Sequence, residues 1–507
     1  MSRHSHPCRR FLRLQLAALL ATLFAQLDPT VAADVKPTNF VFILVDDLGQ
    51  RDLGCYGSSF YETPNIDALA RQGARFTDAY AACPVCSPTR ASIMTGQYPQ
   101  RTGITDYIGA AQPEGWKRNT KLLPAAYSTR LELEELTLAD SLKTKGYATF
   151  FAGKWHMGPE GFWPENQGFD VNIGGIDKGG PYGGKRYFSP YGNPRLPDGP
   201  EGEHLPDRLA RETVKFMEAN RDKPFLTYLS FYSVHTPLMA RPDLAEKYQA
   251  KAAALPPHEP RFGREEPRDV RLVQDHPVYA SMVEAMDQAV GKVLKGLKDL
   301  GLEKTTAVIL TSDNGGLSTS EGWPTSNLPL RGGKGWLYEG GIREPLIIRW
   351  PGVSKPGSIV SVPVISPDFF TTIARVASAP PPKHRDGIDL RRMLRGGESP
   401  GRPLYWHYPH YGNQGGAPGS AIREGKWKLI EWLEDGKLEL YNLAEDIGEK
   451  NDVAAANPEV VGRLKTKLDA WRQDVGAKMP AKNPAYTTEK PDGRESKRPT
   501  EKAGAAK

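Results

Sequence analysis

Side chains that can bind a metal or move protons follow four short apolar runs of this chain. The runs are NFVFILV, YATFFA, FLTYLSFYSV and TAVILTS, and each is typical of a buried strand in a mainly parallel sheet. The polar residues that follow them are Asp46, Asp47, Lys154, His156, His235, Asp313 and Asn314. Because ligands bind beyond the carboxyl ends of such strands, we expect these side chains to form one site.

Four of these side chains offer hard oxygen ligands. They are Asp46, Asp47, Asp313 and Asn314. Carboxylate and amide oxygens suit Ca²⁺ better than Zn²⁺, so the set indicates a calcium site. A pair of acids after a strand is also common as a helix cap or a loop feature, and a histidine beside a tryptophan is often only packed. The interpretation as a metal site therefore depends on all of these residues occurring together, and no single residue is sufficient for it.

The segments between these strands predict an α/β fold. Residues 64–72 are predicted to form a helix, with Thr63 as its N-terminal cap and Gly73 at its end. Residues 279–300 carry one apolar helical stripe, and Gly301 ends that helix. Strands that alternate with helices predict a large mixed, mainly parallel sheet flanked by helices.

The pattern changes after the proline-rich residues 379–382. Short alternating runs between residues 420 and 443 predict a smaller antiparallel sheet, and an amphipathic helix begins at Asn457-Pro458. We expect a catalytic α/β domain at 34–400, a C-terminal α+β subdomain at 401–480 and an extended, disordered tail at 481–507.

The first 33 residues have the pattern of a secretory signal peptide. Four arginines and no acid precede an apolar run, which ends in the small residues Val31-Ala32-Ala33. We therefore expect an exported protein, periplasmic or extracellular. The general secretory and twin-arginine routes both remain open, since Arg9-Arg10 lies in the basic segment.

Composition excludes several classes of protein. With 507 residues, 25% charged and 39% apolar, the chain is neither disordered throughout nor a multi-span membrane protein. A net charge of +6, from 66 basic and 60 acidic residues, is too small to indicate a nucleic-acid partner. Beyond the signal peptide no apolar run is long enough for a membrane span, and four cysteines exclude a disulfide scaffold.

Residues 83–96, CPVCSPTRASIMTG, contain two cysteines three positions apart. Such a pair can be a redox or zinc motif, but no second pair completes a zinc site. The segment C-S-P-T-R followed by A-S-I-M-T-G resembles the signature of the type I sulfatases, in the alkaline phosphatase superfamily. The other motifs of that family also occur in its order. They are the acids at 46–47, GKWHMG at 153–158, VHTP at 234–237, SDNGG at 312–316 and LRGGKGWLYEGGIREP at 330–345.

The resemblance implies a modified cysteine and a bound Ca²⁺. The motif cysteine of the family, here Cys86, is oxidised to formylglycine (3-oxoalanine) by a formylglycine-generating enzyme. Hydrated formylglycine would be the nucleophile on sulfur and a further ligand of the metal, with Arg90 close enough to neutralise it. The other two cysteines, Cys55 and Cys83, would be a disulfide or buried thiols.

The resemblance also implies roles for the basic residues. Lys154 and His156 would contact the sulfate and the formylglycine hydroxyls, with His156 removing the second hydroxyl proton. His235 would be the general acid to the leaving oxygen. Lys334 would be the other sulfate-binding lysine and share the leaving-group role.

Two segments outside the motifs bear on the substrate. Residues 174–192 are rich in Gly, Tyr and charge, and residues 405–416 combine aromatic residues with histidines. Polar groups beside aromatic faces suit a sugar ring, although an aromatic loop over a domain joint would look the same. We expect a sulfated glycan, with galactose or N-acetylgalactosamine sulfate favoured by resemblance to secreted bacterial polysaccharide sulfatases. The candidate specificity residues are Asp177, Lys178, His407 and His410.

Three alternatives remain open from the sequence. One is a phosphonate monoester or phosphodiester hydrolase with the same nucleophile and fold. Another is an exported glycan-binding protein in which Cys86 is never oxidised. A zinc phosphatase of the superfamily is disfavoured, because its extra His and Asp ligands are not evident.

Overall fold

The computed structural model describes Met1, residues 38–490 and Asp492, and the signal peptide expected at 1–33 lies outside this part apart from Met1. Residues from Thr38 onward form one compact unit. No helix among the described residues is long and apolar enough to cross a membrane.

A nine-stranded sheet forms the centre of this unit, in the order β11-β2-β10-β9-β1-β6-β4-β5 with β12 beside β2. The strands are β1 (Asn39–Val45), β2 (Ala74–Tyr80), β4 (Ala148–Gly153), β5 (Val171–Ile173), β6 (Phe225–Ser230), β9 (Thr306–Ser312), β10 (Arg343–Arg349), β11 (Ser358–Val360) and β12 (Val364–Ile365). Strand β1 runs parallel to β6 and β9, whereas β10 is antiparallel to β9 and β2. The predicted mixed, mainly parallel sheet is confirmed.

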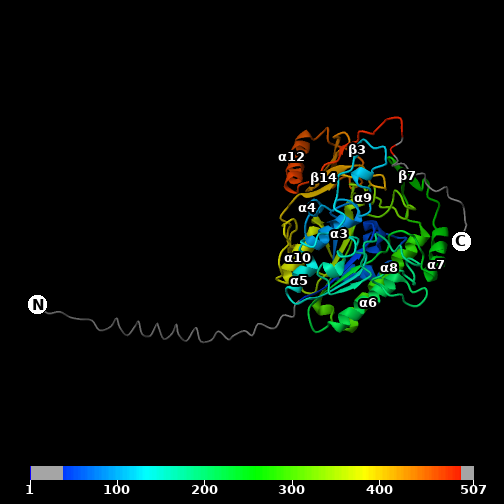
Figure 1. Cartoon of the computed structure of the whole chain (residues 1–507), viewed down its shortest axis with the longest axis vertical. Helices are drawn as coiled ribbons and strands as arrows, with labels where there is room; N and C mark the ends of the chain where they lie inside the picture. The colour runs from blue at the N-terminus through cyan, green and yellow to red at the C-terminus, as the bar shows by residue number, and fades with distance from the viewer. Residues whose placement is uncertain (2–37, 491, 493–507) are drawn as a thin grey trace. The chain divides into compact units, whose positions relative to one another are not determined.

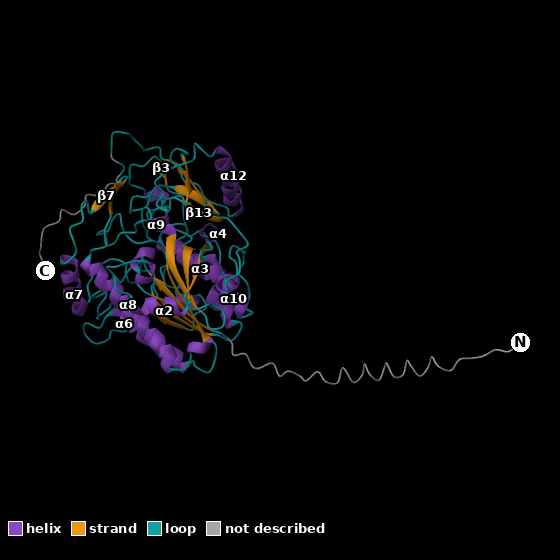
Figure 2. Ribbon diagram, turned by 180° about the vertical axis from the view of Figure 1, so that it is seen from behind, coloured by secondary structure: helices purple, strands orange, loops and turns teal. Residues whose placement is uncertain are grey.

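Helices cover both faces of the sheet (Figures 1 and 2). The α-helices of the described residues are α2 (Pro64–Gln72), α3 (Cys86–Thr95), α4 (Pro99–Thr102), α5 (Leu138–Lys143), α6 (Leu205–Ala219), α7 (Pro242–Ala253), α8 (Pro277–Asp299), α9 (Glu339–Ile342), α10 (Pro367–Val376), α11 (Arg391–Leu394) and α12 (Pro458–Asp474). Alternate residues of β1 enter opposite cores, since successive strand side chains point to opposite faces. Val41 and Ile43 pack in the core that contains α6 and α8, and Phe40 and Phe42 in the core that contains α3 and α10.

A four-stranded antiparallel sheet follows in the chain. It consists of β13 (Leu404–Tyr408), β14 (Gly419–Glu424), β15 (Trp427–Trp432) and β16 (Leu438–Asn442). Leu464, Leu468 and Trp471 of α12 pack against it, and the same core reaches Tyr80 at the end of β2. The expected C-terminal sheet and helix are thus present.

Two short pairings lie outside the two sheets. The hairpin of β7 (Phe262–Glu265) and β8 (Arg268–Arg271) was not indicated by the sequence pattern. Strand β17 (Ala481–Lys482) pairs with β3 (Leu122–Leu123), so the start of the extended C-terminal segment lies against the folded unit.

Candidate active site

Three carboxylates meet where β1 and β9 end. Asp46 and Asp47 directly follow β1, and Asp313 directly follows the adjacent parallel strand β9. One ligand oxygen from each of the three lies within 4.8 Å of the others, and all three side chains are buried. Asp47 has a positive φ of 59°, a conformation that side-chain-bearing residues adopt sparingly and mostly at functional positions.

Two buried oxygens of this cluster lack hydrogen-bond donors. No described residue donates a hydrogen bond to Asp46 Oδ1 or to Asn314 Oδ1. The Asn314 amide nitrogen donates to Asp47 Oδ1 at 2.7 Å, which leaves its oxygen free. Buried acceptors without donors are rare in folded proteins, and hard oxygen donors are the ligands of Ca²⁺. The donor set therefore fits the predicted cation.

Three cations contact the three carboxylates. Arg90 of α3 donates through Nε to Asp313 Oδ2 at 2.9 Å, and Lys154 donates through Nζ to Asp46 Oδ2 at 2.7 Å. Lys334 donates through Nζ to Asp47 Oδ2 at 2.9 Å. Burial raises the pKa of Asp47, but Lys334 and His235 outweigh it and hold that pKa below its usual value.

Cys86 lies at the first position of α3, with its thiol against an imidazole. The Cys86 Sγ is 3.3 Å from His156 Nδ1, and His156 Nε2 is 2.8 Å from the carbonyl oxygen of Ile108. A carbonyl oxygen only accepts, so in the neutral ring Nε2 carries the hydrogen and Nδ1 presents a lone pair to Cys86. Burial, and then Lys154, lowers the pKa of His156, which keeps the ring neutral.

His235 lies beside Asp47. Its Nε2 is 3.8 Å from Asp47 Oδ2, and its Nδ1 is 2.7 Å from the carbonyl oxygen of Thr236. Burial, and then Lys334, lowers the pKa of His235 to about 3. The neutral ring therefore donates from Nδ1 to Thr236 and presents an unprotonated Nε2.

These groups open into a cavity of about 210 Å³. Its lining consists of Cys86, Tyr107, Ile108, His156, Gly179, Tyr182, His235, Glu321, Lys334, Asn413 and Gln414. Seven of these residues were not among the candidates from the sequence, namely Ile108, Gly179 and the five polar or aromatic residues Tyr107, Tyr182, Glu321, Asn413 and Gln414. Tyr182, Asn413 and Gln414 do fall in the two aromatic segments that indicated a sugar. Tyr107 and Glu321 lie outside them and carried no recognisable signal.

The structure does not bring the four candidate specificity residues into this lining. His407 contacts the Ser420 hydroxyl at 2.7 Å and the Lys478 carbonyl at 2.9 Å, and it is buried. His410 is equally buried, with Nε2 2.9 Å from the Thr105 hydroxyl. The expectation for these two histidines is corrected, because both rings pack inside the protein.

Asp177 and Lys178 lie next to the cavity. They pair with each other at 3.2 Å on the surface and directly precede Gly179, which does line the cavity. Their position leaves them near the entrance but outside the lining.

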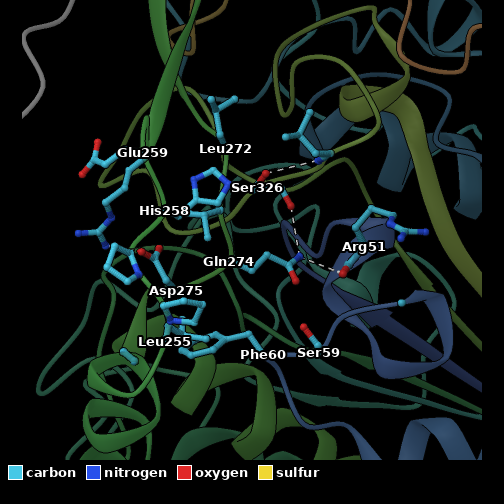
Figure 3. Close-up of a pocket in the computed structure, with 17 residues that line it drawn as sticks. Arg51, Ser59, Phe60, Leu255, His258, Glu259, Leu272, Gln274, Asp275 and Ser326 are labelled. Atoms are coloured by element: carbon cyan, nitrogen blue, oxygen red, sulfur yellow. Dashed lines mark hydrogen bonds and ion pairs between the residues drawn. The ribbon is translucent and has the colours of Figure 1, made fainter.

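A larger cavity of about 520 Å³ lies elsewhere, between residues 51–60 and 252–275 (Figure 3). Gln274 is held in it by the carbonyl oxygens of Arg51 and Ser326. Figure 3 shows Arg51 and Glu259 on opposite sides of the cavity, and Asp275 is paired with Arg261 of the same lining. It contains none of the candidate residues.

The cysteines of the described part are free thiols. Cys83 and Cys86 are buried and Cys55 is partly exposed, with no disulfide among them. Burial raises the pKa of the Cys83 thiol, so this side chain is an inert neighbour of Cys86.

Comparisons of the sequence and the structure with known proteins all point to the same family. The profile described as Sulfatase matches residues 38–379, and that described as N-sulphoglucosamine sulphohydrolase, C-terminal, matches residues 333–474. A protein named Sulfatase from Formosa agariphila is 33% identical over 91% of this chain and 94% of its own length. Arylsulfatase A of Homo sapiens is 34% identical over 85% of this chain and 87% of its own.

A solved structure is similar along most of the chain. The crystal structure of Ps i-CgsB in complex with k-i-k-neocarrahexaose has a TM-score of 0.71 and 29% identity, and the match covers 89% of this chain and 95% of that one.

Proposed function

The chain belongs to the sulfatase family, and from this premise we propose that it releases sulfate from carbohydrate sulfate esters, with formylglycine made from Cys86 as the nucleophile and Ca²⁺ as the cofactor. The single observation that carries this proposal is the grouping of side chains at the floor of the 210 Å³ cavity. There Cys86, Lys334 and the two histidines border a buried cluster that still holds oxygens without donors.

The acidic cluster would hold the metal. Asp46, Asp47, Asp313 and Asn314 supply the oxygens, and two of these oxygens have no competing donor. Bound Ca²⁺ would supply positive charge to the sulfuryl oxygens. The three acids face three cations of this chain, so the added metal gives the floor the net positive charge that an anionic ester requires.

Cys86 is the position at which the nucleophile would be made. Hydrated formylglycine supplies a hydroxyl nucleophile when it is present, as the resemblance of the C-S-P-T-R motif implies. The lone pair of His156 Nδ1, held toward position 86 by the bond from Nε2 to Ile108, is placed to accept a hydroxyl proton there.

Lys334 and His235 are the groups proposed to protonate the leaving oxygen. Asp47 raises the pKa of Lys334 against the lowering effect of burial, so Lys334 carries its proton. His235 presents an unprotonated Nε2 in its neutral form and has to gain a proton before it can donate one. We therefore infer that Lys334 donates to the leaving oxygen and that His235 assists beside it.

The alcohol part of the ester is proposed to be a sugar. The cavity entrance combines aromatic rings with amide and carboxylate groups, which suits stacking and hydrogen bonding to a ring with hydroxyls. The similar solved structure is named as a complex with a neocarrahexaose, an oligosaccharide by its name. Galactose and N-acetylgalactosamine sulfates remain the proposed substrates.

Maturation and location are part of the proposal. A formylglycine-generating enzyme would have to act on Cys86, and the sequence of the first 33 residues supports export to the periplasm or the exterior. The described part adds no membrane-crossing helix.

The test is sulfate release from sulfated mono- and oligosaccharides and from 4-nitrophenyl sulfate. The protein is co-produced with a formylglycine-generating enzyme, and mass spectrometry verifies the modification at position 86. A phosphodiester and a phosphonate monoester serve as competing substrates. Sulfate release at least 100-fold faster than phosphate release supports the proposal, and the reverse order contradicts it.

A further inference from the structure

The entrance of the cavity carries a carboxylate although its floor is built for an anion. Glu321 lines the same 210 Å³ cavity as Lys334 and Cys86. A negative group at this entrance repels a sulfate ester, so it weakens substrate binding unless it makes a compensating contact with another part of the substrate.

One oxygen of Glu321 is held in place by the protein. Oε1 accepts a hydrogen bond of 2.8 Å from the amide nitrogen of Gln414, which is itself 3% exposed. Glu321 forms no ion pair within 4.0 Å among the described residues, although burial of Lys334 is opposed by Asp47 and then Glu321, which raise the pKa of that lysine. The second oxygen, Oε2, is therefore available to a donor that enters the cavity.

The loop around Glu321 holds a conformation that costs free energy. Glu321 has a φ of 51° and Trp323 a φ of 46°, both in the left-handed region that favours glycine. Trp323 fixes the loop from two sides, because its ring donates to the Asp269 carbonyl and its own carbonyl accepts from Arg271. Such strain persists when surrounding contacts impose it, and it is frequent at ligand-binding positions.

Tyr182 supplies the apolar part of the same entrance. Its side chain is 56% exposed, and its ring meets the His235 imidazole edge-on with centroids 6.4 Å apart. An exposed aromatic face next to a catalytic histidine offers a stacking surface for the sugar ring that carries the sulfate. The cavity is smaller than the roughly 300–1,000 Å³ of drug-sized sites, so only that first ring fits beside the sulfate.

We propose that Glu321, held by Gln414, accepts a hydrogen bond from a hydroxyl of the sulfated sugar ring and excludes rings that carry a second anionic substituent. The inference rests on the proposed function and narrows it to neutral sugar rings with one sulfate group. A hydroxyl donor gains a charge-assisted bond, whereas a second sulfate or a carboxylate meets like charge.

The test compares monosulfated sugars with the same rings carrying a second sulfate. For the wild type, kcat/KM for galactose 6-sulfate is expected to exceed that for galactose 2,6-disulfate at least tenfold, and the N-acetylgalactosamine pair should behave alike. In Glu321→Gln this ratio should fall at least tenfold, through a higher KM for the monosulfate and a lower KM for the disulfate. Glu246→Gln on α7, which removes an exposed carboxylate outside the lining, is the matched control and should keep the wild-type ratio.

The outcomes separate this inference from the proposed function. If the wild type cleaves the monosulfated and disulfated sugars with nearly equal kcat/KM, the role of Glu321 is overturned. This result needs no variant, so it holds even if Glu321→Gln does not fold. An unchanged ratio in folded Glu321→Gln overturns it as well. In both cases sulfatase activity still stands, whereas a wild type with verified formylglycine and no release from any sulfate ester refutes the proposed function itself.

Discussion

Two buried clusters of this protein each combine three acids with three bases, yet they differ in how closely their acids are paired and in whether they border a cavity. The cluster at the strand ends contains Asp46, Asp47, Asp313, Arg90, Lys154 and Lys334. The cluster at the joint between the two sheets contains Asp78, Glu339, Glu449, Arg343, Arg423 and Lys428. Each cluster holds one acid oxygen that accepts no hydrogen bond, Asp46 Oδ1 and Glu449 Oε1. Glu449 Oε1 still has Lys428 Nζ at 2.8 Å, whereas the nearest cation to Asp46 Oδ1 is Arg90 at 3.5 Å, and the first cluster borders a cavity.

The joint cluster closes on itself. Lys428, which is fully buried, lies between Glu339 at 2.9 Å and Glu449 at 2.8 Å, and Arg343 links Glu339 to Asp78. Its members come from β2, α9, β10, β14, β15 and, for Glu449, the loop after β16, so its pairs connect the large sheet to the small one. The comparison teaches that buried charge alone does not mark a site, whereas buried charge with spare acceptors beside a cavity does.

The largest expected effect is on activity, at Cys86 in the cavity beside the first cluster. Cys86→Ala removes the proposed nucleophile, so sulfate release should fall by at least about 10⁴-fold, a loss typical of nucleophile removal. The melting temperature should change by less than about 3 °C, because the variant alters only the end of one small side chain. Both are measured on purified protein, and residual activity above 1% would contradict the assignment.

Asp313→Asn should lower sulfate release by about 10³-fold, since it removes one charge of the proposed metal site while keeping the side-chain volume. Elemental analysis should find Ca²⁺ in the wild type and little in the variant. Added Ca²⁺ should raise the melting temperature of the chelator-treated wild type and not that of the variant. A variant that retains stoichiometric calcium would contradict the assignment of the first cluster as the metal site.

Glu339→Gln tests the joint cluster, and its effect should appear in stability. It leaves Lys428 and Arg343 buried with one acid fewer, which typically costs about 3–5 kcal/mol in the free energy of unfolding. Denaturant unfolding measures this loss, and kcat per folded molecule should remain within twofold of the wild type. A large loss of kcat with unchanged stability would reverse the roles assigned to the two clusters.

Replacement of His407 should give the smallest effect, which is a change in how the free energy of unfolding depends on pH. Burial lowers its pKa to about 4, below the ordinary value of about 6.5, so the unfolded chain gains the proton first as the pH falls. Its contribution is complete above about pH 6.5 and is lost as the pH falls to about 4, by on the order of 1–3 kcal/mol. Unfolding at pH 7 and pH 4.5 should show a smaller difference in His407→Gln than in the wild type.

The sequence predicted the floor of the site better than its entrance, for a physical reason. Asp46 and Asp313 directly follow buried strands, and parallel strands bring their carboxyl ends to one edge whatever the loops do. Glu321 depends instead on long-range contacts of Trp323 with the β7–β8 hairpin, which no local pattern encodes.

His407 was misassigned for a related reason. It alternates along β13 with Trp406 and Tyr408, which enter the core between the sheets, so its own ring points to the other side. There Ser420 and Lys478 cover it. Aromatic and polar composition indicated a binding surface, but only the strand register decides which face a side chain occupies.

Most of the floor and the entrance of the cavity come from different stretches of chain. Asp46, Asp47 and Asp313 follow strand ends and Cys86 begins α3, whereas Tyr107, Tyr182, Glu321 and Asn413 come from four loops that are far apart in sequence. Lys334 of the floor is the exception, because it shares the connection between β9 and α9 with Glu321. Divergence after gene duplication can therefore change the proposed sugar preference through these loops, while the acids at the strand ends are inherited intact. A library for a new glycan preference should randomise these loop positions together and leave the strand ends untouched.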